Sequence, residues 1–153
     1  MNIFEYLEHD NIFTDFDVKN KTEFFQKAVD LIAQKYPCFD RNELLELYGK
    51  REKTMTTGIG KQIAIPHIIY EKCDAQMILI FRLKEPIDFA SLDKKQVKLV
   101  LMLIGPVTAN NFPYLQVLAK LSRMLKRDET VLKLLEAETR DGIIKVLNDY
   151  EHR

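Results

Sequence analysis

The sequence predicts an α/β domain in which helices flank a central, mixed β-sheet on both faces. Apolar residues follow helical spacing in the first and last parts of the chain, whereas the middle holds short runs rich in Ile, Val and Leu. Two of those runs are apolar at nearly every position, as expected for strands covered on both faces. With 153 residues, 46% hydrophobic and 30% charged, the chain suits one domain spanning residues 1–153.

One strand and two helices are predicted in the first part of the chain. Residues 11–18 alternate in polarity, which indicates a strand. Helices are predicted over residues 20–36 and 41–52, because Asn20 and Asp40 are suitable N-caps and each has a glutamate three positions later. The apolar stripes of these two helices are Phe24, Ala28, Leu31 and Ile32, and then Leu44, Leu47 and Tyr48.

In the middle of the chain, the spacing of apolar residues changes from that of helices to that of strands. Strands are predicted at residues 63–66, 75–83 and 97–105, where β-branched and other apolar residues cluster. Turn signals occur at Glu85-Pro86 and at Gly105-Pro106.

Helical spacing returns in the last part of the chain. Residues 110–129 predict a helix, in which Pro113 is tolerable only in the first turn. Two shorter helices are predicted at residues 129–138 and 139–150. The predicted apolar face of the longer helix consists of Leu115, Leu118, Leu121 and Leu125.

Composition and charge argue against several function classes. The 23 Lys and Arg residues balance 23 Asp and Glu residues, so nucleic acid is not the expected partner. No apolar run is long enough to cross a bilayer and no signal peptide is visible, so we expect a soluble, cytoplasmic protein without direct membrane insertion. Neither the cysteines, Cys38 and Cys73, nor the histidines, His9, His67 and His152, are spaced as a metal site, and no cofactor is expected.

Residues 51–67 carry the groups on which we expect chemistry. Arg51 ends the second predicted helix, and Thr56, Thr57 and Gly58 follow it in a predicted loop. Hydroxyls, free backbone amides and an arginine fork are groups that hold an anion such as phosphate. The same groups also occur in loops without a ligand, where threonines only shape the backbone. No nucleotide P-loop pattern is present.

His67 is the candidate nucleophile of this stretch. It follows Pro66, which has a fixed φ and no N–H and therefore tends to end a strand ladder. We accordingly expect His67 at the end of the sheet, where α/β proteins place their sites. A histidine after an apolar run also occurs as a purely structural residue, and spacing alone does not separate the two.

These residues resemble a known family. Arg51-Glu52 followed by "TTGIGKQIAIPH" closely resembles the mannitol/fructose-class (type 2) enzyme IIA domain of the bacterial phosphoenolpyruvate-dependent phosphotransferase system, which includes the nitrogen-regulatory branch. The resemblance continues in "FRLKEPIDFASLDKKQVKLVLMLIGP" and in "YLQVLAKLSRMLKRDETVLKLLEAET", so it spans nearly the whole chain.

The resemblance implies a phosphoryl carrier. His67 would accept a phosphoryl group from an HPr-type phosphocarrier protein and pass it to an enzyme IIB or use it as a regulatory signal. The phosphoryl group brings about −1.5 to −2 of charge, which Arg51 and the loop of Thr56, Thr57 and Gly58 would offset. Family members use no metal or nucleotide for this step, so the resemblance adds no cofactor.

The sequence departs from the family pattern at three places. Tyr114 stands where the family commonly has a second histidine; it is expected either to face the site or to pack at a helix start. Ile68 replaces the usual small residue after the histidine and should crowd the site. Lys61-Gln62 replace Asn-Gly, and we favour Lys61 pointing to solvent over Lys61 adding positive charge beside the site.

Two functional readings remain open. The favoured one is a phosphohistidine carrier, and within it a stand-alone nitrogen-regulatory protein rather than a sugar importer, since no IIB or IIC segment is fused to the chain. The alternative is a binding module that keeps the fold but has impaired phosphotransfer, as Tyr114 and Ile68 suggest. Both readings predict an apolar rim around His67 for docking a carrier, formed by Ile59, Ile68 and Ile69.

Overall fold

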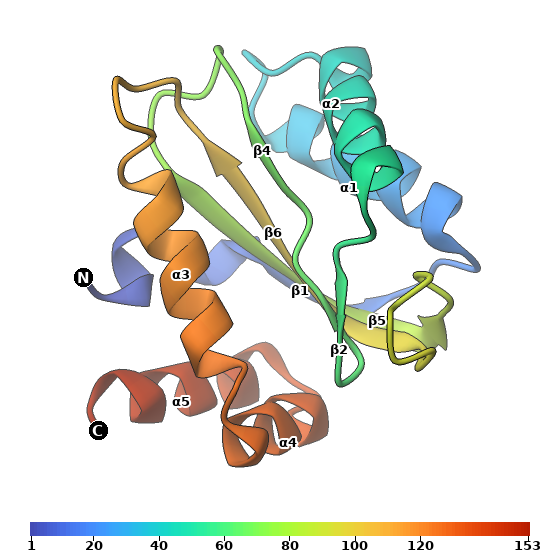
Figure 1. The fold of residues 1–153 in the computed structure, drawn as a ribbon, viewed down its shortest axis with the longest axis vertical. Coiled ribbons are helices and arrows are strands. Elements are labelled where there is room, and N and C mark those ends of the chain that lie inside the picture. Colours follow the sequence, from blue (N-terminus) through green and yellow to red (C-terminus); the bar gives the residue numbers. More distant parts are fainter.

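A single mixed sheet between two helical layers organises residues 1–153, which the computed structural model describes in full (Figure 1). Two 3-10 turns precede the first strand. In chain order the elements are η1 (Ile3–Glu5), η2 (His9–Asn11), β1 (Ile12–Phe16), α1 (Lys21–Lys35), α2 (Arg41–Thr54), β2 (Gly58–Gly60), β3 (Ile63–Ala64), β4 (His67–Ile69), β5 (Met77–Ile87), β6 (Val97–Gly105), α3 (Tyr114–Met124), α4 (Asp128–Glu136) and α5 (Arg140–Glu151).

The sheet is mixed, as predicted. Its order is β1-β5-β6-β3-β2, and β4 also pairs with β6. The central pair β5 and β6 is antiparallel, whereas β1 runs parallel to β5, and β3 and β4 run parallel to β6. The predicted turn at Glu85-Pro86 is wrong, because β5 continues to Ile87; a register irregularity between Arg82 and Ile87 accommodates the proline within the strand.

Helices cover both faces of the sheet, which confirms the predicted layers. In Figure 1, α1 and α2 lie over one face, and α3, α4 and α5 lie over the other. Strand β6 alternates between the two cores, so every one of its residues except Lys98 is buried. Val100, Met102 and Ile104 belong to the core with α1 and α2, whereas Leu99, Leu101 and Leu103 belong to the core with α3 to α5.

The predicted helix starts are confirmed at α1 and α2. The Asn20 side chain accepts a hydrogen bond from the Glu23 N–H at 2.8 Å, and the Asp40 carboxylate accepts one from the Glu43 N–H at 3.0 Å. No helix of the structure has the length and the apolar character needed to cross a membrane.

The predicted apolar face of α3 is partly wrong. Leu115 is 49% exposed, whereas Tyr114 at the start of the helix is buried. The reason is the 3.6-residue period: a face that contains the buried residues Val117, Leu121 and Met124 includes position 114 and turns position 115 outward.

His67 does not lie at the end of the sheet, contrary to the prediction. Strands β3 and β4 pair with β6 in one continuous register, Ile63 opposite Leu99 and His67 opposite Leu103. Pro66 lies at the interruption between them, and its carbonyl accepts from the Leu103 N–H at 2.9 Å. The proline therefore breaks a strand that resumes at once, and His67 begins the second half of it.

Candidate functional site

Two hydrogen bonds fix the imidazole ring of His67. Its Nδ1 lies 2.6 Å from the Ile65 carbonyl oxygen, and Arg51 Nε–H donates to its Nε2 at 3.3 Å. A carbonyl oxygen only accepts and a guanidinium only donates, so Nδ1 carries the proton and Nε2 carries the lone pair. The geometry selects one tautomer, with the lone pair on Nε2.

The surroundings keep this ring neutral. Burial lowers the pKa of His67 below its ordinary value of 6.5, because the charged imidazolium is the form that loses hydration. The Ile65 carbonyl raises the pKa, and the Arg51 guanidinium lowers it. Since the net shift is downward, the ring carries its lone pair at neutral pH.

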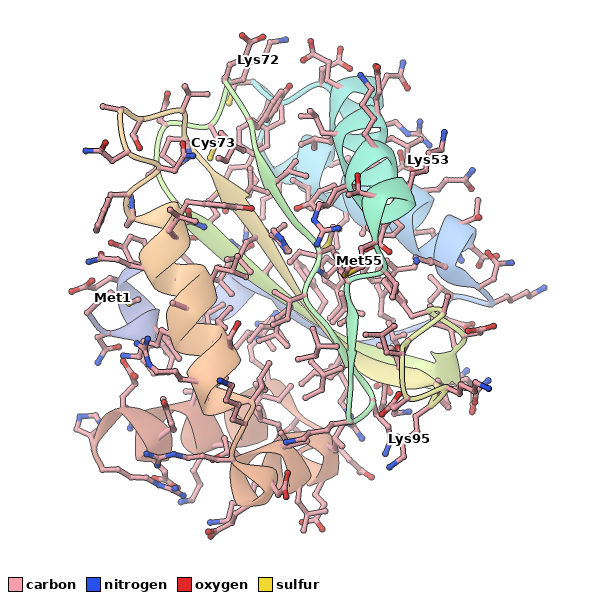
Figure 2. The ribbon with its side chains drawn as sticks, viewed as in Figure 1. Met1, Lys53, Met55, Lys72, Cys73 and Lys95 are labelled. Atoms are coloured by element: carbon pink, nitrogen blue, oxygen red, sulfur yellow. The ribbon has the colours of Figure 1, made fainter.

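Arg51 reaches His67 from the last turn of α2. Its Nη1 donates to the Met55 carbonyl at 2.7 Å, which anchors the guanidinium plane while Nε faces the ring. Figure 2 shows Met55 where the chain leaves α2 toward β2. The structure thus places Arg51 in contact with His67, and its role as a phosphate ligand stays a prediction.

The threonine loop is held by hydrogen bonds within the chain. Thr56 Oγ1 donates to the Phe89 carbonyl at 2.6 Å and accepts from the Gly58 N–H at 3.1 Å. The Thr57 hydroxyl donates to the Glu52 carboxylate, and Thr57 is 3% exposed. Here the threonines shape the backbone, and their role as phosphate ligands, with Gly58, stays a prediction. Gly58, predicted in a loop, begins the short strand β2, which pairs with β3.

Tyr114 faces the site from α3. Its ring centroid lies 6.2 Å from that of His67 at an interplanar angle of 49°, and the residue is 8% exposed. Burial raises the pKa of Tyr114 to about 12, so its phenol stays neutral. A Cβ at Gly105 would lie 2.7 Å from Tyr114 Cδ1, so the ring approaches β6 only because residue 105 is a glycine.

Comparison with known proteins identifies the family of this chain. The family model described as "Phosphoenolpyruvate-dependent sugar phosphotransferase system, EIIA 2" matches residues 5–150. The chain belongs to this family. As an EIIA domain it is a phosphotransferase component of that system, with a carrier or regulatory role.

Relatives of this EIIA domain act in sugar transport and in nitrogen regulation, by their names. The fructose-specific EIIA component of Haloferax volcanii is 37% identical over 119 residues, 78% of this chain and 77% of that protein. The nitrogen regulatory protein of Pseudomonas aeruginosa is 29% identical over 133 residues, 87% of this chain and 86% of that protein. The fructose-specific EIIABC component of Bacillus subtilis is 34% identical over 99% of this chain, which spans only 24% of that longer protein.

Solved structures agree with the fold. Nitrogen regulatory protein IIA-Ntr of Neisseria meningitidis has a TM-score of 0.83 and 26% sequence identity, with 94% of this chain and 97% of that one covered. Mannitol IIA of Escherichia coli has a TM-score of 0.72 at 22% identity, with 92% and 97% covered, and shares the fold.

Of two expectations about departures from the family pattern near His67 of this EIIA domain, one is wrong and one is confirmed. Ile68 does not crowd the site: successive residues of a strand point to opposite faces, and Ile68 is 5% exposed in the core with α1 and α2. Lys61 is exposed, as expected, with 45% of its side chain accessible; its Nζ pairs with the exposed Asp128 at 2.7 Å and donates to the Leu125 carbonyl at 3.3 Å. It stabilises the end of α3, where a cation suits the helix dipole.

The predicted apolar rim is therefore smaller. Ile59 is 49% exposed and Ile69 is half-buried, but Ile68 is not part of it. Met55, next to the anchor of Arg51, is 61% exposed and adds apolar surface that the prediction omitted.

Two residues that were not predicted to act at the site take part in its hydrogen bonds. Glu52 accepts from Thr57, and its carboxylate pairs with Lys21 of α1 at 2.5 Å. Tyr48 is fully buried and donates to the Leu103 carbonyl at 2.9 Å, on the strand residue opposite His67. The sequence holds one signal for Glu52, its place directly after Arg51. Because neighbouring residues of a helix point in different directions, the two side chains lie on different sides of α2.

Proposed function

We propose that His67 Nε2 accepts a phosphoryl group from an HPr-type phosphocarrier protein and passes it on. The observation that carries this proposal is the fixed tautomer: Nδ1–H is donated to the Ile65 carbonyl, and the lone pair of Nε2 faces Arg51. Nucleophile and anion ligand are thus side by side, as phosphoryl transfer by positioning and charge stabilisation requires.

In the proposed transfer every bond, electron pair and proton is accounted for without a cofactor. The Nε2 lone pair attacks phosphorus, the N–P bond of the donor phosphohistidine breaks, and its electron pair returns to the donor nitrogen. The Nδ1 proton stays in its hydrogen bond to Ile65, whose carbonyl oxygen stabilises the positive charge that the ring gains. Arg51 Nε–H then donates to a phosphoryl oxygen in place of the lone pair.

Other predicted residues assist in the phosphorylated state. Thr56, Thr57 and Gly58 lie between Arg51 and β3 in the chain, and we retain them as phosphate-binding candidates. Tyr114, a neutral phenol facing His67, would donate one hydrogen bond to a phosphoryl oxygen.

For the biological use, we favour a nitrogen-regulatory protein working in the cytoplasm, with residues 1–153 acting as one enzyme IIA unit. Support comes from the likeness to IIA-Ntr, of which 97% is covered. The two free cysteines suit a reducing compartment. In that use the phosphorylation state of His67 controls binding to a regulatory target protein. In sugar transport the phosphoryl acceptor is instead a cysteine of an enzyme IIB, and the fructose-specific relatives favour sugar transport.

A second candidate rests on Tyr114. A phenol cannot supply the cationic charge of a second imidazolium near the phosphoryl group. If that charge is required for efficient transfer, the chain is a regulatory binding module that keeps the fold, and His67→Ala leaves partner binding unchanged.

Intact mass after incubation with phosphoenolpyruvate, enzyme I and HPr tests the carrier. One acid-labile phosphoryl group is expected on the wild type and on His152→Ala, a matched histidine that is exposed at the end of α5. None is expected on His67→Ala. Absence of a phosphoryl group on the wild type with cognate carriers refutes phosphotransfer and leaves the binding module.

A further inference from the structure

Glu52 is a nearly buried carboxylate one residue after Arg51. Its side chain is 9% exposed and pairs with Lys21 Nζ at 2.5 Å. It accepts from the Thr57 N–H at 3.2 Å on Oε1 and 3.3 Å on Oε2, and from the Thr57 hydroxyl. These hydrogen bonds are charge-assisted, and they lie in a nearly buried environment, where such bonds are strong.

Backbone hydrogen bonds continue from Thr57 to the imidazole ring. The Thr57 carbonyl accepts from the Ile65 N–H at 2.9 Å. The Ile65 carbonyl accepts from His67 Nδ1–H at 2.6 Å. Each link runs between residues that the fold holds in place: Ile65 is 2% exposed and Thr57 is 3% exposed. A displacement of Thr57 therefore moves the carbonyl that selects the tautomer.

Lys21 braces the carboxylate from a second helix. Its Nζ also donates to the Phe89 carbonyl at 3.2 Å and lies 4.7 Å from the centroid of the Phe89 ring. The same carbonyl accepts from Thr56 Oγ1. The segment that precedes β2 is thus attached to α1 and α2 through one ion pair.

We propose, resting on the proposed function, that Glu52 is a positioning residue that sets the reactive tautomer of His67. Helix α2 acts on both ring nitrogens: Arg51 contacts Nε2 directly, and Glu52 acts on Nδ1 through Thr57 and Ile65. Second-layer groups of this kind orient the reacting atom, and a misplacement of about 1 Å costs roughly 100-fold in rate.

The experiment compares Glu52→Ala with a matched control, Glu151→Ala. Glu151 is also a nearly buried carboxylate: its side chain is 3% exposed, pairs with Lys120 at 2.5 Å and accepts from the Ile3 N–H at 2.7 Å. It differs in place, because it connects the C-terminal helix α5 to the N-terminal segment of the chain. The readouts are the ¹⁵N shifts of the His67 ring in the unphosphorylated protein, assigned with His67→Ala, and the rate of phosphorylation by phospho-HPr. Thermal unfolding establishes that each variant is folded at the working temperature.

We expect Glu52→Ala to populate the Nε2–H tautomer of His67 and to lower the phosphorylation rate by about 10- to 100-fold. Glu52→Gln keeps an oxygen that accepts from Thr57 and should recover most of both properties. Glu151→Ala should lose stability without changing either. An unchanged tautomer in Glu52→Ala, with or without a slower rate, overturns the proposal, as does an equal tautomer change in Glu151→Ala.

A second variant covers failure of Glu52→Ala to fold. Thr57→Val is isosteric and removes only the hydroxyl donated to Glu52. In that case an unchanged His67 tautomer in Thr57→Val refutes the positioning role. The ¹⁵N shifts are measured without a phosphoryl donor. A tautomer change in Glu52→Ala therefore supports this inference even if the wild type is never phosphorylated, which separates failure of the proposed function from failure of the inference.

Discussion

Replacing Arg51 by methionine removes the guanidinium and keeps the length of the side chain. In the unphosphorylated site Arg51 Nε–H makes one hydrogen bond at 3.3 Å to Nε2, and the anchor at Met55 holds the fork in that position. By the proposed function, the same N–H would donate to a phosphoryl oxygen after transfer. A hydrogen bond to a charged group stabilises by about 1.5–3 kcal/mol, which corresponds to about 10- to 150-fold in the equilibrium constant for phosphorylation.

The measurement is the phosphorylated fraction by intact mass across a series of ratios of phospho-HPr to HPr, kept at neutral pH because the N–P bond is acid-labile. Lys53→Met is the matched control: Lys53 is exposed on the same turn of α2, and Figure 2 shows it on the outer side of that helix. We expect a lower constant for Arg51→Met alone. A constant equal to that of the wild type, with Lys53→Met also unchanged, refutes the role of Arg51 as a phosphoryl ligand.

Three further results are expected. Gly105→Ala should cost about 1–3 kcal/mol of unfolding free energy in urea, as overpacking does, since its Cβ would lie 2.7 Å from Tyr114 Cδ1 and 2.8 Å from Gln76 Oε1; unchanged stability contradicts this close approach. Tyr114→Phe should lower the equilibrium constant for phosphorylation by the contribution of one hydrogen bond to a charged group, about 1.5–3 kcal/mol or about 10- to 150-fold, and an unaltered constant assigns Tyr114 to packing alone. Because burial lowers the pKa of His67 below 6.5, the phosphorylation rate should be constant at neutral pH and fall only at acidic pH. The contribution of His67 to stability should likewise be complete above pH 6.5 and be lost as pH falls through the lowered pKa; an NMR titration midpoint above 6.5 contradicts both statements.

The helices and central strands were predictable because their signals are local. Asn20 and Asp40 cap the helices that follow them with their own side chains, and β6 is apolar along its length because both faces are covered. The misses arose where a second element decided the outcome. The register with β6 turns Ile68 into the core, and the packing of α3 on the sheet turns Leu115 outward.

The sequence by itself determined the family, the layered α/β fold and the candidate nucleophile, since the string around His67 is specific and hydrophobic period reports which face of an element is buried. Only the tertiary structure decided which nitrogen of His67 is free. That choice depends on the Ile65 carbonyl and on Arg51, whose positions follow from the pairing of β3 and β4 with β6 and from the packing of α2. Lys21 joins Glu52 from another helix. Hydrogen bonds need both partners within about 3 Å, and contacts between residues far apart in the chain leave no periodic signal in the sequence.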